Sequence, residues 1–294
     1  MTRRRSLLLL STALLLATPT AAVAATTLGS PGSPGGGCNG SDPVEVIQTA
    51  RANGAKDAAT SPGVITSWTY NPGSGESVVT LRVYRPTPAA NQYVVLAEDG
   101  PPRTLAASSG AHTFPTRIPL SAGNTIGLRV ASGSCLSTTS SSVDKLLIKP
   151  GTPTAVGGTA TFPIASSATN IYVTAIVEPD VDLDGYGDET QDACPAKPST
   201  QQPCPSPDTV ITKKPKRHSL KPKRKLTFTS TIAGSSFSCS IDGKTAKGCT
   251  SPATYKCLKP GKHAFSVVAT SPAGVVDPTP ATTKFRVPAD RRGC

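Results

Sequence analysis

The segment Ser77-Val-Val-Thr-Leu-Arg-Val-Tyr-Arg85 decides the fold of this chain. Val79, Leu81 and Val83 fall at every second position, which is the period of a β-strand with one buried face. The same alternation returns at 125–131. Clusters of Gly, Pro, Asn and Ser bound both stretches, so we expect short strands joined by turns.

Further β-rich stretches lie on either side of these two. The chain holds 26 glycines, 29 prolines and only 4% aromatic residues, which favours short strands over long amphipathic helices. We predict an antiparallel β-sandwich of jelly-roll type over residues 41–178. Trp68 is predicted to lie in its core, and an exposed sugar platform is the alternative. The remaining strands are expected at 44–47 (where a helix start is the alternative), 64–70, 92–98, 113–118, 143–148, 159–164 and 170–178.

A second β pattern follows residue 207. Leu226–Ile232 and Phe237–Asp242 alternate, and Asp242-Gly243 is a strong hairpin signal. With further strands at 263–269 and 282–287, residues 208–288 are expected to form an immunoglobulin-like sandwich of about seven strands.

The predicted fold class is therefore all-β. It comprises two antiparallel β-sandwiches, a larger jelly-roll-like one and a smaller immunoglobulin-like one. An acidic, proline-rich linker over 179–207 is expected to join them.

The N-terminus has the pattern of an export signal. Arg3–Arg5 supply the positive region, Leu7–Ala17 an apolar core too short to span a bilayer, and Ala22-Val23-Ala24 a small-residue cleavage site. Residues 1–25 are therefore predicted to be a signal peptide, and the mature protein to be secreted or associated with the cell surface. The Gly/Pro/Ser-rich stretch 26–40 is expected to be disordered, and 289–294 to be a C-terminal tail.

All eight cysteines lie beyond the predicted signal peptide, and an even number in an exported chain suggests four disulfides. A zinc site is disfavoured because the sequence has no CxxC and only three histidines. Local grouping suggests the pairs Cys38–Cys135, Cys194–Cys204, Cys239–Cys249 and Cys257–Cys294.

A regular pattern of aspartates begins at Asp180. Carboxylates at loop positions one, three, five and nine, with Gly185 at position six, suit a hard cation that prefers oxygen ligands. We predict a structural Ca²⁺ site that fixes the joint between the sandwiches; the alternative is an acidic, solvated linker. The predicted ligands are Asp180, Asp182, Asp184, Tyr186, Asp188 and Asp192.

Charge is unevenly distributed in a chain whose formal net charge is +12. Residues 26–204 carry a net charge of −4 and residues 205–294 one of +13. A basic run predicts a salt-sensitive contact with an anionic cell-wall polymer or a membrane surface, and the alternative is a solvated loop. Nucleic acid is not expected, because of export and because no aromatic residue interrupts the run. Its cations are Lys213, Lys214, Lys216, Arg217, Lys221, Lys223, Arg224 and Lys225.

Two stretches resemble known families. The run Asp-Val-Asp-Leu-Asp-Gly-Tyr-Gly-Asp-Glu-Thr-Gln-Asp-Ala-Cys-Pro at 180–195 resembles the calcium-binding repeats of the thrombospondin type 3 family. The match departs from that family at position twelve, where Gln191 stands and the carboxylate comes one residue later, at Asp192. The second stretch has Phe237-Ser-Cys-Ser-Ile-Asp-Gly, Leu258-Lys-Pro-Gly-Lys-His-Ala-Phe and Asp277-Pro-Thr-Pro-Ala. It is similar to the bacterial immunoglobulin-like modules of exported actinobacterial proteins, which implies a spacer or adhesive unit.

Motifs for catalysis are lacking: the sequence contains no GxSxG, no HExxH and no phosphate-binding glycine loop. We predict an exported, non-catalytic structural or adhesive cell-surface protein with a calcium-stabilised joint. One alternative is a glycan-binding protein that uses Trp68, Tyr84 and Tyr93 as an exposed platform. The other is a glycan-active hydrolase that uses Glu98-Asp99 and Glu178 as its carboxylates.

Overall fold

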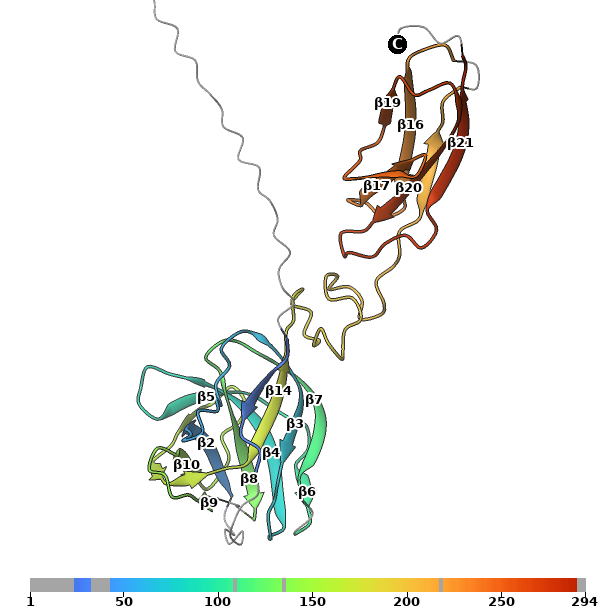
Figure 1. The fold of residues 1–294 in the computed structure, drawn as a ribbon. Coiled ribbons are helices and arrows are strands. Elements are labelled where there is room, and N and C mark those ends of the chain that lie inside the picture. Colours follow the sequence, from blue (N-terminus) through green and yellow to red (C-terminus); the bar gives the residue numbers. More distant parts are fainter. Residues whose placement is uncertain (1–23, 33–42, 108–109, 134–135, 217–218, 290–294) are drawn as a thin grey trace, which may run out of the picture.

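The computed structural model describes residues 24–32, 43–107, 110–133, 136–216 and 219–289. Every regular element in these ranges is a β-strand, and every strand pair is antiparallel. None of the described residues belongs to a helix long and apolar enough to cross a membrane. Figure 1 shows two β-sheet bodies, joined by a segment without regular structure. The predicted all-β class is confirmed.

The first sandwich consists of two main sheets. One has the strand order β11-β5-β4-β8-β2-β10-β12, with β6 also paired to β4, and the other has the order β1-β14-β3-β7. A small sheet of β9 and β13 completes it. The strands are β1 Thr26–Gly29, β2 Val44–Ala50, β3 Gly63–Tyr70, β4 Ser77–Pro86, β5 Gln92–Glu98, β6 Arg103–Leu105, β7 His112–Leu120, β8 Thr125–Ser132, β9 Ser137–Thr138, β10 Lys145–Pro150, β11 Thr159–Thr161, β12 Ile164–Ser167, β13 Thr169–Asn170 and β14 Val173–Glu178.

The main core lies between these two sheets. Val79, Leu81 and Val83 of β4 are fully buried in it, as their alternation predicts. Trp68 is also buried there, and its indole N–H donates to Asp99 Oδ2 over 2.7 Å. The prediction of a core tryptophan is confirmed.

The opposite face of β4 is buried as well, which the alternation alone did not predict. Tyr84 packs there with Phe162 in a second apolar cluster, at a ring-centroid distance of 5.9 Å. Beside it, the Arg82 guanidinium donates to Glu45 and Glu98, with N···O distances of 3.1 and 2.6 Å. Polar residues on this face are thus buried as ion pairs rather than exposed to solvent.

Strand β1 corrects the expectation that 26–40 is disordered. Thr26–Gly29 pairs with β14 from Thr26↔Val177 to Gly29↔Thr174, and Leu28 is buried in the main core. The Gly/Pro/Ser-rich composition of the whole segment concealed a short Thr-Thr-Leu-Gly strand at its start. The later part, 33–40, lies outside the described residues.

The second sandwich has seven strands in two sheets, ordered β15-β16-β19 and β18-β17-β20-β21. Its core includes Leu226, Phe228, Phe265 and Val267. The predicted immunoglobulin-like sandwich, with its Asp242-Gly243 hairpin between β17 and β18, is confirmed by this hydrogen bonding. The strands are β15 Thr209–Lys213, β16 Lys223–Ser230, β17 Ser236–Ile241, β18 Lys244–Lys247, β19 Ala253–Lys256, β20 Gly261–Thr270 and β21 Ala281–Val287.

Candidate metal centre

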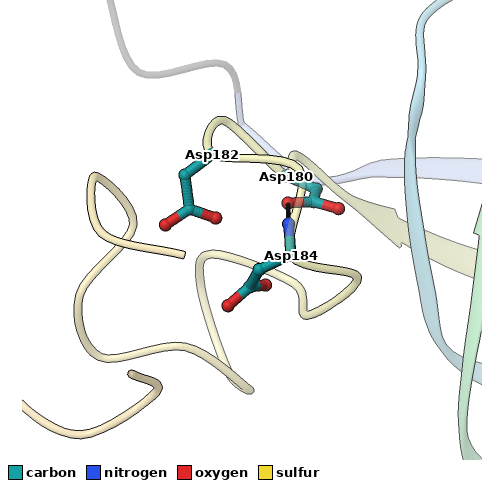
Figure 2. A group of neighbouring side chains, drawn as sticks. All are labelled: Asp180, Asp182 and Asp184. Carbon is teal, nitrogen blue, oxygen red and sulfur yellow. Dashed lines mark hydrogen bonds between the residues drawn. The ribbon is translucent and has the colours of Figure 1, made fainter. Parts of the chain in front are cut away.

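The aspartate-rich loop begins directly after β14 and folds back on itself (Figure 2). Carboxylate oxygens of Asp180, Asp182 and Asp184 lie within 4.8 Å of one another. The intervening side chains point away, since Val181 is 70% and Leu183 79% exposed. The alternation in the sequence therefore separates inward carboxylates from outward apolar residues.

Asp180 and Asp184 shape the turn. The two carboxylate oxygens of Asp180 accept from the N–H groups of Asp184 and Gly185, each over 3.0 Å. Asp184 Oδ1 accepts from Tyr186 N over 2.9 Å. Gly185 has φ +85°, in the left-handed region that glycine adopts without strain, as the sequence pattern predicts.

Asp182, Asp188 and Asp192 present oxygens that have no hydrogen-bond partner. Among the residues that the structure describes, four such buried oxygens belong to this loop: both of Asp182, Oδ1 of Asp188 and Oδ2 of Asp192. The N–H groups of Asp184 and Lys197 lie close enough to Asp182 to act against the rise of its pKa, but their hydrogen bonds go to Asp180 and to the carbonyl of Cys194. Buried carboxylates are normally paired or bound to a metal, so these four oxygens are candidate ligands for a cation.

Burial and mutual repulsion raise the pKa values of two of these carboxylates. Burial raises the pKa of Asp188 to about 6, and the charges of Asp180, Asp182 and Asp192 add to the shift. Burial also raises the pKa of Asp182, together with the charges of Asp184 and Asp192. The loop thus concentrates negative charge that no side-chain cation of the described residues neutralises by an ion pair.

The structure clarifies the displaced carboxylate at Asp192. Gln191 turns toward the sandwich, where its Nε2 donates to the Thr116 carbonyl over 2.8 Å and its Oε1 accepts from Gly187 N over 3.3 Å. Asp192 is only 4% exposed, and its negative charge helps to raise the pKa values of Asp182 and Asp188. Asp192 therefore joins the acidic cluster, whereas Gln191 anchors the loop to β7.

Glu178, the last residue of β14, holds the second half of the loop. Its Oε2 accepts from Glu189 N and Thr190 N over 3.0 and 2.9 Å, and its Oε1 accepts from the hydroxyls of Thr190 and Thr66. Burial alone would raise the pKa of Glu178, but these hydrogen bonds hold it below its usual range. A Cβ on Gly187 would lie 2.5 Å from Glu178 Oε2, so only glycine fits there. Sequence reasoning missed this role.

Two further contacts fix the loop on the first sandwich. The guanidinium of Arg117, on β7, lies 4.0 Å from the centroid of the Tyr186 ring. Because this contact occupies the ring of Tyr186, its contribution as a predicted ligand would come from the backbone carbonyl. In the full chain, Ala25 N donates to Glu189 Oε1 over 2.6 Å, a contact that removal of the predicted signal peptide 1–25 would delete.

The Cys194–Cys204 disulfide closes the segment that follows, with a Cα–Cα distance of 4.8 Å. Gln201, inside this closed segment, donates from Nε2 to Asp184 Oδ2 over 2.7 Å. The closed segment is thereby tied to the acidic loop. Residues 205–208 alone connect it to β15.

Within the described residues, two of the four predicted disulfides are confirmed, Cys194–Cys204 and Cys239–Cys249. Cys257 is also disulfide-bonded. The other predicted partners, Cys38, Cys135 and Cys294, lie outside the described residues.

The basic run is divided by the fold. Arg224 is 2% exposed, and its guanidinium donates to the carbonyls of Ser219 and Lys221, so it serves the local structure. Lys223 and Lys225 are exposed on β16, and Lys213 ends β15. Lys214, Lys216 and Lys221 are exposed outside the strands, and Arg217 lies outside the described residues.

The residues of the predicted glycan platform do not form an exposed surface. Trp68 and Tyr84 are buried, and they belong to different apolar clusters on opposite sides of the large sheet. Only Tyr93 is partly accessible. The alternative of a stacking platform built from these three rings is wrong, because Trp68 is buried in the main core and Tyr84 in the second apolar cluster.

The carboxylates considered for glycan hydrolysis all have structural partners. Glu98 pairs with Arg82, and Asp99 accepts from Trp68, Thr116 and Arg103. Glu178 holds the acidic loop, as described above.

Comparisons with known proteins add little to this geometry. No family model matches the chain, and no curated protein matches it. A solved structure of fibronectin(III)-like modules of Clostridium thermocellum CbhA matches with 12% sequence identity. The match covers 92% of this chain and 97% of that one, with a TM-score of 0.24. At this TM-score the two folds are not superimposable over their length, and the strand pairing of this chain alone defines its two sandwiches.

Proposed function

We propose that this chain is an exported, non-catalytic structural protein in which the aspartate loop binds Ca²⁺. The four unpartnered carboxylate oxygens of Asp182, Asp188 and Asp192 carry the proposal. Asp180 and Asp184 complete a set of oxygen donors beside them. An all-oxygen, carboxylate-rich set on a loop suits Ca²⁺, which accepts six to eight ligands in flexible geometry.

Binding would stabilise the loop by neutralising its repelling charges. Ca²⁺ outside the cell, where modules of this kind bind at about 10⁻⁴–10⁻³ M, would keep the site occupied. The disulfides support an oxidising, extracellular location. The engagement of Glu98, Asp99 and Glu178 in structural contacts supports a non-catalytic role.

The contacts of the loop refine its role in the joint. Through Glu178 and Gln191 the loop is held on the first sandwich, and through Asp184 and Gln201 it holds the disulfide-closed segment. We therefore expect Ca²⁺ to extend the rigid first sandwich as far as Cys204. The remaining pivot is Pro205-Ser206-Pro207, in which proline restricts the backbone.

Calorimetric titration of chelator-treated protein with Ca²⁺ tests the proposal. We expect one site with a dissociation constant of about 10⁻⁴–10⁻³ M. Asp182→Asn and Asp188→Asn should each weaken binding at least about tenfold, because a charged ligand is lost. Asp208→Asn is the matched control, since Asp208 is an exposed aspartate directly before β15 and outside the loop. Absence of binding, or equal weakening by the control, would refute the site.

A second measurement concerns the loop without metal. In chelator, the two loop variants should unfold at a slightly higher temperature than the parent, since they relieve repulsion. In Ca²⁺ the order should reverse, because only the parent gains binding energy. Small-angle scattering of the parent should report a stiffer joint with Ca²⁺ than without it.

A further inference from the structure

A basic groove lies on the second sandwich, where the chain leaving β15 runs beside β20 and β21. Its volume is about 670 Å³. Only two of its five cations belong to the basic run of the sequence; the other three come from strands far along the chain. The groove is lined by Lys214, Lys216, Lys262, Lys284 and Arg286, with Phe285 between the last two.

Strand geometry explains the convergence of these cations. Lys284 and Arg286 are exposed at alternate positions of β21, and side chains two residues apart on one strand face lie about 7 Å apart. Lys262 of β20 is directly opposite Arg286, where Cβ atoms lie about 5 Å apart. The residues after β15 add Lys214 and Lys216 from the other side of the groove. The cations thus form a spaced array rather than one point.

No carboxylate lines the groove, and none of its five cations forms an ion pair within the described part of the chain. The nearby Asp242 is engaged elsewhere: its Oδ2 lies 2.6 Å from Nδ1 of His263. The other ring nitrogen of His263 contacts the Lys259 carbonyl over 2.7 Å. The described residues therefore leave this array of like charges without a compensating carboxylate.

We propose that this groove binds a linear polyanion whose successive anionic groups contact successive cations. The inference concerns a different region from the Ca²⁺ loop and does not depend on it. Concave placement favours a chain-like ligand over a flat membrane surface. The large exposed apolar side chains of this sandwich, Val210, Leu220 and Val276, do not line the groove, so it has no group to insert into a bilayer.

The groove is also poorly suited to reading nucleic-acid bases. Among the described residues that line the groove, Phe285 is the only aromatic one. It is only 8% exposed and stacks on His263 at a centroid distance of 5.6 Å. It therefore offers no face on which a base could stack. The groove would therefore bind its ligand through Coulomb attraction between its cations and repeated anionic groups.

Binding of long-chain inorganic polyphosphate to the full mature chain, measured by calorimetry at several salt concentrations, tests the proposal. The variant Lys284→Glu/Arg286→Glu should lose at least about tenfold in affinity. The slope of its log affinity against log salt concentration should also become less steep, by the amount expected for the loss of about two phosphate contacts. The matched control is Lys223→Glu/Lys225→Glu, which makes the same change in net charge on exposed positions of β16. The affinity of this control for polyphosphate should stay within about threefold of that of the parent, because β16 belongs to the other sheet.

Equal losses in the two variants would overturn the proposal, since net charge alone would then explain binding. Orthophosphate that binds as tightly as the polymer would also overturn it, in favour of a small-anion site. So would tighter binding to vesicles of phosphatidylglycerol and phosphatidylcholine than to polyphosphate. Lys284→Gln/Arg286→Gln serves as a milder second variant, and its thermal unfolding checks the fold. Polyphosphate binding should be unchanged in chelator, which separates this result from the Ca²⁺ proposal.

Discussion

The buried network of the first sandwich and the basic groove of the second use charged side chains in opposite ways. In the first, Arg51 is buried and paired with Asp57 over 2.7 Å, and Arg82 is buried between Glu45 and Glu98. In the second, the groove cations face solvent, and no carboxylate of the described residues pairs with them. The first region therefore uses charge to specify its fold, whereas the second leaves charge available for a ligand.

The largest expected effect comes from breaking the buried network of the first sandwich. Glu45 accepts from Arg82, Lys149, Tyr84 and the backbone of Thr154. Burial alone would raise the pKa of Glu45, but the hydrogen bonds from Thr154 and Lys149 hold it below its usual range. Glu45→Ala should lower the free energy of unfolding by about 3–5 kcal/mol, because Arg82 loses a partner in a buried site.

Urea unfolding measures this loss, and Arg286→Ala in the groove is the contrast, with an expected change below about 0.5 kcal/mol. If Glu45→Ala cost no more than the groove variant, the distinction between the two sandwiches would fail.

A loss of stability of intermediate size is expected from a substitution of Asp277, a buried carboxylate of the second sandwich. It accepts from Thr209 N and from both N and Oγ1 of Thr279. Burial alone would raise the pKa of Asp277, but these hydrogen bonds hold it below the ordinary value of 3.8. The folded-state pKa is thus lowered, so its stabilisation is complete above about pH 4 and is lost as the pH falls through the folded value.

Asp277→Asn should reduce the stability of this sandwich at pH 7 by about 1–3 kcal/mol, because a charged acceptor of several bonds is lost. It should also flatten the decline in stability below pH 4. Thermal unfolding between pH 3 and 7 gives both quantities. A parallel decline in parent and variant would assign the acid sensitivity to other groups.

The smallest expected effect is on the free energy of unfolding of a groove variant, which should not fall as it does in the two variants above. Lys284→Gln/Arg286→Gln should leave stability unchanged or raise it by a few tenths of a kcal/mol at low salt, since it relieves repulsion between exposed cations. The gain should disappear in high salt, where such charges are screened. Thermal unfolding at two salt concentrations measures it, and a loss above about 1 kcal/mol would show that these cations support the fold.

Most strand positions could be predicted, because side-chain alternation and turn residues are local signals. The stretches 159–164 and 170–178, each expected as one strand, are instead divided between two strands. The stretch 92–98 was expected as a strand and forms β5, and Asp242-Gly243 forms the expected hairpin. The covering of both faces of β4 was not predictable, since it depends on Phe162 and Glu45, which only tertiary packing brings to it. Strand β1 was missed because four residues carry too weak a pattern within a Gly/Pro/Ser-rich segment.

Some features of the acidic loop could likewise be predicted from the sequence, and others could not. Its inward carboxylates and the turn at Gly185 could be predicted, because both depend on spacing within a few residues. The placement of Asp192 among them depends on Gln191 bonding to Thr116, on a distant strand. The role of Glu178 likewise depends on Thr66 and Thr190 meeting at its carboxylate. The groove escaped sequence analysis because three of its cations come from β20 and β21.

The disulfide-closed segment has a mechanical consequence. A pull on the second sandwich passes through Pro205-Ser206-Pro207 to Cys204, and from there directly to Cys194. The bridge spans a sequence separation of 10 residues, so this length cannot extend under load. Force spectroscopy of the reduced protein should show about 30 Å of additional extension. In the oxidised protein, tension reaches the aspartate loop and then β14, which is flanked by β1 and β3 and resists shear along both.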